Sequence, residues 1–335
     1  MKIAILDDYQ NAIAALECFR FLAGHEVRIW TDHTEDVALL AERLHDTEAV
    51  VLLRGRTPMT AALLERLPQL RLISQSGHTD HIDLAACTRL GIVVSAISAT
   101  RPSYATAELT WGLVIAAQRS LCTEVAGLKA GRWQSALGQG LRGHTLGIYG
   151  YGRIGALVAG YGKAFGMRVL VWGRDSTLEK ARRDGFATAD SRAAFFAESD
   201  VLSLHLRYLA ATRHLVTAAD LTGMKPTALF VNTSRAELVE PGALEDALRL
   251  GRPGKAAVDV YETEPTPPDH PLLALDNALC SPHLGYIERD SHEFAFGNAF
   301  DQVVAFAQGQ PLNVCNPEAV GRRGAPATAA TTATA

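Results

Sequence analysis

The sequence predicts an α/β protein with two doubly wound domains, each built on a parallel β-sheet. Three observations lead to this prediction. Short apolar runs alternate with amphipathic segments over the first hundred residues, a long helical stretch interrupts the alternation, and the alternation then restarts. A chain of 335 residues is long enough for two domains. Two such domains usually hold a cofactor between them, so we expect a cleft there.

The first domain is expected to contain buried strands separated by helices. The strands are predicted at residues 2–6, 26–30, 49–53, 71–75 and 92–96. These runs are largely apolar, which is typical of strands that are covered on both faces. One of the intervening helical patterns, at residues 60–67, is stopped by Pro68.

A long helix is expected over residues 103–132, between the two alternating modules. The strands of the second module are predicted at residues 144–150, 168–172, 201–206, 228–232, 256–260 and 278–282. A last helix, at residues 288–308, follows the second sheet, and we expect it to return to the first domain.

The predicted domains are therefore residues 1–100 with 287–317, and residues 101–286. Residues 318–335 are expected to form a disordered tail, because large apolar side chains are missing from Arg322 onward.

Composition excludes several classes of protein. With 32 basic and 36 acidic side chains, the net charge of −4 makes no electrostatic case for binding nucleic acid or a membrane surface. The apolar stretch at the N-terminus is too short for a signal peptide, and no run is long enough to span a membrane, so we expect a soluble protein. The scattered cysteines are Cys18, Cys87, Cys122, Cys280 and Cys315. Their spacing matches neither a disulfide framework nor a zinc site, which favours reduced thiols in the cytoplasm and no bound metal.

The segment Gly150-Tyr151-Gly152-Arg153-Ile154-Gly155 lies between a predicted strand and a predicted helix. The pattern G-x-G-x-x-G is weak alone, since glycines also serve in turns and tight packing. Its position here favours a dinucleotide site, in which glycines let the backbone approach a pyrophosphate at the positive end of the helix.

The next predicted strand ends in Gly173-Arg174, and Asp175 follows. An NAD site normally has an acidic side chain at this strand end to bind the ribose 2′-hydroxyl. The missing carboxylate and the nearby arginine favour the 2′-phosphate of NADP. NAD stays open, because Asp175 could bend back to the ribose and Arg174 could simply be solvated.

Four segments, the first of which contains this glycine loop, occur in a recognisable order: LRGHTLGIYGYGRIG, VNTSRAELVEPGALEDAL, AAVDVYETEP and DHPLLALDNALCSPHLG. Together they resemble the signatures of the D-isomer-specific 2-hydroxyacid dehydrogenase family, and the resemblance covers residues 2–317. It implies a flavodoxin-like substrate domain and a Rossmann NAD(P) domain. It also implies a homodimer formed through residues 103–132, although the large apolar side chains there could equally be core.

The resemblance assigns the chemistry to Arg235, Glu264 and His283. A guanidinium can bind the carboxylate of a 2-keto acid and polarise its carbonyl, which is the role implied for Arg235. A histidine titrates near neutral pH, so His283 can give or take the proton at that carbonyl. Glu264 is implied to orient the ring and favour its protonated form. Glu262 is close by, but the spacing from Asp259 favours Glu264.

The family pattern also implies contacts to the cofactor and the substrate. The cofactor positions are Gly150, Gly152, Arg153, Ile154, Gly155, Gly173, Arg174, Asp175, Leu206, Thr233, Asp259 and Gly285. In the first domain, the loop at Ser76 and Gly77 corresponds to the segment that presents backbone amides to the substrate carboxylate. Arg54 and Arg56 are either further anion contacts or surface charges.

Three departures from the family pattern border the expected cleft. SGHTDHID lacks the usual second glycine, Arg207 stands where a proline is common, and Ala236 stands where glycine is usual. No reacting group is lost. We therefore expect an NAD(P)-dependent oxidoreductase that interconverts small 2-keto acids and D-2-hydroxy acids. The substrate is left open between the glyoxylate or hydroxypyruvate type and the phosphoglycerate type, and the alternative is a nucleotide-sensing, corepressor-like binding protein.

Overall fold

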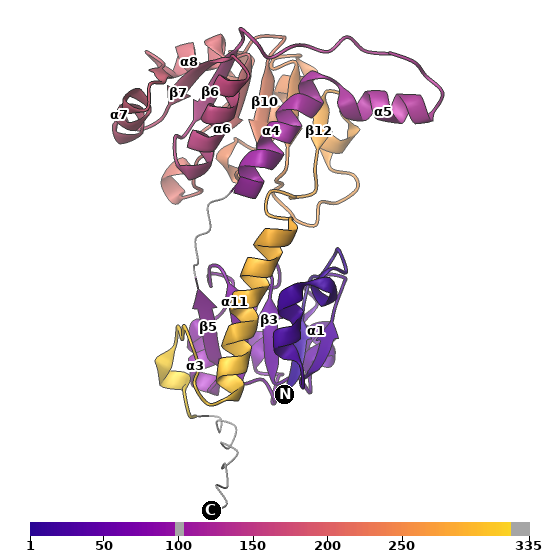
Figure 1. Cartoon of the computed structure of the whole chain (residues 1–335), viewed down its shortest axis with the longest axis vertical. Helices are drawn as coiled ribbons and strands as arrows, with labels where there is room; N and C mark the ends of the chain where they lie inside the picture. The colour runs from indigo at the N-terminus through magenta and orange to yellow at the C-terminus, as the bar shows by residue number, and fades with distance from the viewer. Residues whose placement is uncertain (98–103, 323–335) are drawn as a thin grey trace, which may run out of the picture. The chain divides into compact units, whose positions relative to one another are not determined.

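A computed structural model describes residues 1–97 and 104–322 (Figure 1). The chain divides into two compact units: unit 1 holds residues 1–101 and 288–335, and unit 2 holds residues 102–287. Each unit is an α/β fold on a parallel sheet, which confirms the predicted fold class. The last long helix belongs to unit 1.

Unit 1 has strands and helices in alternation. The strands are β1 (Lys2–Ile5), β2 (Glu26–Ile29), β3 (Ala49–Leu52), β4 (Leu72–Ser76) and β5 (Val93–Ile97). The helices are α1 (Val37–Leu44), α2 (Ala61–Leu64), α3 (Leu84–Leu90), α11 (Arg289–Ala307) and the 3-10 helices η1 (Ile13–Ala15), η2 (Glu17–Leu22) and η6 (Pro317–Ala319). The strands pair in parallel in the order β2-β1-β3-β4-β5, which is the flavodoxin-like order.

Helices cover both faces of this sheet. Val50 and Leu52 of β3 pack in one core cluster with side chains of α1, α2 and α3. On the other face, Ser74 of β4 donates its hydroxyl to the Ala299 carbonyl of α11. The expectation that residues 26–30 form a buried strand is wrong in one respect: β2 is an edge strand with exposed and half-buried side chains, because β1 alone pairs with it.

Unit 2 repeats the architecture on a longer sheet. Its strands are β6 (Thr145–Tyr149), β7 (Arg168–Trp172), β8 (Ala187–Thr188), β9 (Val201–Leu204), β10 (Leu229–Asn232), β11 (Lys255–Val258) and β12 (Ala278–Cys280). Its helices are α4 (Tyr104–Gln118), α5 (Leu121–Lys129), α6 (Arg153–Ala164), α7 (Asp175–Arg183), α8 (Arg192–Glu198), α9 (Ala218–Thr222), α10 (Ala243–Arg249) and the 3-10 helices η3 (Ala210–Thr212), η4 (Ala236–Leu238) and η5 (Pro271–Ala274). The short strand β8 was not predicted.

The strands of unit 2 pair in parallel in the order β12-β11-β10-β9-β6-β7-β8. One core cluster joins the sheet to α4, α6 and α7, and another joins it to α8, α9 and α10. The sheet is therefore covered on both faces, as a Rossmann fold requires. The direction of the strand order reverses between β6 and β9, which is the point where doubly wound sheets bind dinucleotides.

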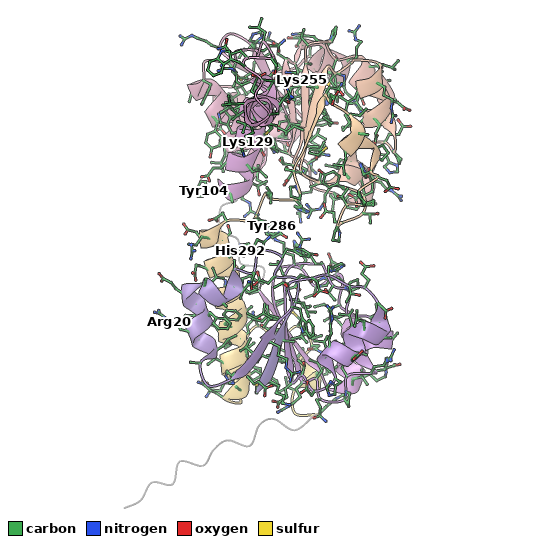
Figure 2. The ribbon with its side chains drawn as sticks, turned by 90° about the vertical axis from the view of Figure 1, so that its right-hand side faces the viewer. Arg20, Tyr104, Lys129, Lys255, Tyr286 and His292 are labelled. Atoms are coloured by element: carbon green, nitrogen blue, oxygen red, sulfur yellow. The ribbon has the colours of Figure 1, made fainter. Side chains whose placement is uncertain are left out.

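The single helix expected over residues 103–132 is wrong. Within the part that the structure describes, α4 ends at Gln118 and α5 starts at Leu121. Ser120, between them, has a left-handed backbone with φ of 50°. Lys255 of β11, which is labelled in Figure 2, comes from the sheet of unit 2. Its ammonium donates to the Ala117 carbonyl at 3.1 Å, so a residue of the sheet satisfies one carbonyl at the end of α4.

The apolar side chains of α4 belong to the core: Leu113 is 6% exposed and Val114 is fully buried. Most of the predicted tail lies outside the described residues. Its first part is ordered, however, because Ala319 of η6 is 1% exposed and Arg322 donates to the Thr88 carbonyl at 3.4 Å.

Asp200 joins two parts of unit 2 just before β9. One carboxylate oxygen accepts from the Lys225 ammonium at 2.7 Å, and the other accepts from the Thr145 amide at 2.8 Å. Burial acts to raise the pKa of Asp200, but the Lys225 cation and the Thr145 amide outweigh it and hold the pKa below its usual range.

Two cysteines, Cys18 and Cys87, are buried, and burial raises the pKa of each thiol to about 12. Cys122 and Cys315 are exposed. Among the helices formed by residues 1–97 and 104–322, none is long and apolar enough to cross a membrane.

Candidate active site

The glycine loop follows β6 and leads into α6 in unit 2. Gly150 has a φ of 94°, and a Cβ there would lie 2.7 Å from the His205 carbonyl oxygen. A Cβ on Gly155 would lie 2.2 Å from the Gly150 oxygen, so this glycine allows α6 to pack against the loop. Gly152 is different: nothing lies within 4 Å of a Cβ built there, and no side chain caps α6. The loop therefore leaves room for a phosphate at the helix N-terminus.

Arg153 and Ile154 form the first turn of α6, where Arg153 is exposed and Ile154 is half-buried. Beyond β7, Arg174 is the N-cap residue of α7 and Asp175 lies in its first turn. Both side chains are exposed, and Gly173 precedes them. No acidic residue ends β7. The structure, like the sequence, therefore leaves the choice between NAD and NADP open.

Three of the implied catalytic and cofactor residues follow three neighbouring strands. Arg235 comes after β10, Asp259 directly follows β11, and His283 comes after β12. The strands are parallel, so their carboxyl ends lie at one edge of the sheet. Adjacent strands are about 4.8 Å apart, which puts the ends of β10 and β12 roughly 10 Å from each other.

His283 and Glu264 are in direct contact. The ring Nδ1 lies 2.5 Å from the Glu264 Oε2, and the two side chains are 22% and 24% exposed. The other carboxylate oxygen accepts from the Tyr261 amide at 3.1 Å, which fixes the carboxylate. Because Nδ1 is engaged, Nε2 is the ring nitrogen that remains to exchange a proton with a substrate. Glu262 instead pairs with His270 at 3.4 Å.

The His283 segment has two further supports. His283 has a left-handed backbone with φ of 51°. The centre of its ring lies 5.4 Å from the centre of the Tyr286 ring, which is labelled in Figure 2, and the two rings are nearly perpendicular. The Tyr286 ring therefore packs near the imidazole in addition to the Glu264 carboxylate.

Asp259 is 1% exposed and anchors the chain around His283. Its carboxylate accepts from the Ser281 hydroxyl at 2.6 Å, from the Leu284 amide at 2.8 Å and from the Gly285 amide at 2.9 Å. Burial raises the pKa of Asp259 and outweighs these hydrogen bonds, which act to lower it. Through these hydrogen bonds, Asp259 links residues 281–285 to the end of β11.

Arg235 is exposed and is the N-cap residue of η4. Asn232 shapes the turn that carries it, since the Asn232 amide donates to the Arg235 carbonyl at 2.9 Å and its oxygen accepts from the Ser234 amide at 3.0 Å. The Ser234 hydroxyl donates to the Leu204 carbonyl at 2.8 Å. These hydrogen bonds hold the turn, and the exposed Arg235 guanidinium donates through Nη1 to the Ser234 carbonyl at 2.6 Å.

Several supporting residues were not singled out from the sequence. Thr110 of α4 shares a hydrogen bond of 2.7 Å with Thr233, and Thr106 donates to the Gly285 carbonyl at 2.6 Å. Helix α4 thus braces two of the implied cofactor positions. Ser281 could have been found by its position two residues before His283, but the threonines of α4 gave no sequence signal.

In unit 1, Ser76 ends β4 and Gly77 has a φ of 142°. The Gly77 amide donates to the Ile97 carbonyl at 3.1 Å, so in this structure it is hydrogen-bonded to the last residue of β5. Arg54 has a left-handed backbone with φ of 56°, and the Arg56 guanidinium lies 5.0 Å from the centre of the Tyr9 ring.

Comparison with known proteins places this geometry in a family. Residues 111–285 match the model of the D-isomer specific 2-hydroxyacid dehydrogenase, NAD binding domain. A glyoxylate reductase from Aeropyrum pernix is 38% identical over 309 residues, which cover 88% of this chain and 91% of the relative. A D-3-phosphoglycerate dehydrogenase from Methanocaldococcus jannaschii is 34% identical, and the match covers 92% of this chain and 58% of that relative.

A solved structure of a phosphoglycerate oxidoreductase from Vibrio cholerae O395 is similar throughout. It has 50% sequence identity and a TM-score of 0.87, with 92% of this chain and 99% of that chain covered. Together with the parallel sheets, the glycine loop and the His283–Glu264 pair, these matches are decisive: the chain belongs to the D-isomer-specific 2-hydroxyacid dehydrogenase family and is a dehydrogenase that uses a nicotinamide dinucleotide.

Proposed function

We propose that the chain reduces a small 2-keto acid to a D-2-hydroxy acid, with Arg235, Glu264 and His283 as its catalytic residues. The observation that carries the proposal is the contact between His283, which follows β12, and Glu264, which follows β11, at the sheet edge where the implied substrate arginine follows β10. A histidine held by a carboxylate at Nδ1 can present Nε2–H to a substrate oxygen.

The residues would act as follows. Arg235 binds the substrate carboxylate and polarises the neighbouring carbonyl, which its accessible guanidinium allows. His283 donates its Nε2 proton to the carbonyl oxygen in reduction and takes it back in oxidation. Glu264 keeps the ring oriented and balances the positive charge of its protonated form. The bound nicotinamide supplies or accepts the hydride.

The cofactor fits the loop for reasons that this chain supplies. Gly152 leaves the backbone open at the start of α6, and Gly150 and Gly155 allow close packing around it. We propose that pyrophosphate lies against this turn and that Asp259, Thr233 and Gly285 border the nicotinamide end. Exposed Arg174, beside a strand end without a carboxylate, favours NADP over NAD.

A panel of 2-keto acids assayed with NADH and NADPH separately tests the proposal. The panel should include glyoxylate, hydroxypyruvate and phosphohydroxypyruvate, because the named relatives include a glyoxylate reductase and a phosphoglycerate dehydrogenase. Turnover with at least one acid is expected, and His283→Ala should abolish it while nucleotide binding persists. Nucleotide binding without turnover on any acid would contradict the proposal and favour the nucleotide-sensing alternative.

We also propose a homodimer formed through α5 rather than α4. Leu121, Val125 and Leu128 lie on one face of α5 and are 51%, 45% and 58% exposed. Trp133 and Leu137, in the segment that follows, are 76% and 99% exposed. Figure 1 shows α5 and this segment lying away from the sheet of unit 2. An apolar stripe of this kind is typical of a protein interface.

Sedimentation of Val125→Glu against the unaltered chain tests the dimer. The variant should become monomeric, since a charge would be buried without a partner. An unaltered chain that sediments as a monomer at micromolar concentration would contradict this proposal. The cytoplasmic location expected from the scattered cysteines stays a prediction.

A further inference from the structure

Arg207 follows the strand that forms one side of the dinucleotide site. Strand β9 lies next to β6, with Leu204 paired to Tyr149, and the order of the sheet reverses between them. In doubly wound sheets the phosphates of a dinucleotide lie at this reversal. Arg153 lies on the β6 side, in the first turn of α6, and Arg207 lies three residues beyond β9.

The segment before Arg207 touches the glycine loop. A Cβ on Gly150 would lie 2.7 Å from the His205 carbonyl oxygen and 2.9 Å from the Leu206 Cδ2. The His205 carbonyl and the Leu206 side chain therefore lie close against the first glycine. Arg207 is the next residue, so it follows directly on the segment that contacts the glycine loop, and it carries a long side chain.

Arg207 has no competing partner within residues 1–97 and 104–322. Its side chain is exposed, and it forms no hydrogen bond or ion pair with the described residues, as is also true of Arg153. Other arginines of unit 2 form ion pairs; for example, the Arg168 guanidinium lies 2.6 Å from a carboxylate oxygen of Glu198. His205 does not supply a charge, because burial lowers the pKa of its ring to about 3, and Nε2 lies 3.0 Å from the Ser203 hydroxyl.

The loop that carries Arg207 is ordered by its own hydrogen bonds. The Thr212 hydroxyl donates to the Arg207 carbonyl at 2.7 Å and accepts from the Leu209 amide at 2.8 Å. The Arg213 amide donates to the Leu209 carbonyl at 3.0 Å. The backbone of Arg207 is thus held in place, which limits the entropy lost when its guanidinium binds an anion.

We infer that Arg207 is a second phosphate-binding arginine, which binds the cofactor pyrophosphate from the β9 side while Arg153 lies on the β6 side. The inference rests on the proposed cofactor site. A pyrophosphate carries a negative charge on each phosphate, and a guanidinium can form two parallel hydrogen bonds to phosphate oxygens. The amides at the start of α6 and two arginines would together neutralise it.

Direct binding to the full chain tests the inference, with ADP and adenosine as probes that differ by the pyrophosphate. Arg207→Ala should weaken ADP binding about tenfold, the loss expected when a charged hydrogen bond is removed, and leave adenosine binding unchanged. Arg207→Lys should recover part of the affinity. The matched control is Arg213→Ala, which removes the same charge from an exposed position in the same loop and should change neither.

The outcomes separate this inference from the proposed function. If Arg153→Ala weakens ADP binding and Arg207→Ala does not, the inference is wrong and the cofactor site stands. The inference is also wrong if Arg207→Ala raises only the KM of a phosphorylated substrate, or weakens adenosine as much as ADP. If the unaltered chain binds neither NADH nor NADPH, the cofactor site itself is wrong.

Discussion

The pair formed by His283 and Glu264 offers the most direct test of the proposed chemistry. Replacing Glu264 with Gln keeps the shape and one acceptor oxygen but removes the charge, and Glu264→Ala removes the bond entirely. Both side chains are about three-quarters buried, and the two atoms are 2.5 Å apart. The carboxylate should therefore matter most in the step in which the ring donates its proton to the keto acid.

The magnitude follows from the kind of bond that is lost. A hydrogen bond to a charged group contributes about 1.5–3 kcal/mol and a neutral one about 0.5–1.5 kcal/mol. The change to Gln should therefore cost about 1–1.5 kcal/mol, which is roughly tenfold in kcat for reduction. The change to Ala should cost about 2 kcal/mol or slightly more, which is roughly thirty- to a hundredfold.

Steady-state kinetics on the best keto acid, with nucleotide affinity measured by fluorescence, would check these values. The Kd of the reduced cofactor should stay within about twofold, because Glu264 contacts the ring and the Tyr261 amide. Glu262→Gln is the matched control: it removes the charge from the neighbouring pair with His270, at 3.4 Å, and should leave kcat unchanged.

In a double-mutant cycle, His283→Ala should conceal the effect of Glu264→Gln, because the carboxylate acts through the ring. A Glu264→Ala enzyme that keeps kcat within threefold of the unaltered chain would refute the reasoning. Equal losses in Glu262→Gln and Glu264→Gln would refute it as well.

Three further predictions concern the glycine loop, acid stability and thiol chemistry. Gly152→Ala should abolish nucleotide binding and leave the melting temperature unchanged, because a Cβ at Gly152 would meet no protein atom. Gly155→Ala should lower the free energy of unfolding by about 1–3 kcal/mol, because a Cβ at Gly155 would meet the Gly150 carbonyl oxygen. Calorimetry with and without NADH distinguishes the two effects. Asp200→Asn should destabilise the chain by about 1–2 kcal/mol at pH 7 in urea titrations. Since the folded pKa is depressed, this difference should vanish as the pH falls below about 4. An aromatic disulfide reagent at pH 8 should label Cys122 at once and Cys18 only on unfolding.

Features that depend on local patterns were predictable from the sequence. The buried strands show as apolar runs, and all of the predicted strands are present within about two residues of their expected bounds. The glycine loop was recognisable because the strand before it and the helix after it are both visible locally. The family motifs placed Arg235, Glu264 and His283 in order, but they carried no information on contacts.

Features that depend on partners far along the chain were decided by the tertiary structure. Helix α4 ends at Gln118, where Lys255, 138 residues after Ala117, donates to the Ala117 carbonyl and to the Ser120 hydroxyl. The choice of Glu264 over Glu262 as the partner of His283 depends on how the loop after β11 meets the end of β12.

The burial of Asp259 and the closeness of residues 205–206 to Gly150 likewise follow from the order of strands in the sheet. The periodicity of apolar side chains indicates whether a residue is buried, but it does not indicate which segment of the chain buries it. The identity of that segment depends on the strand order, and the strand order is set by packing over the whole unit.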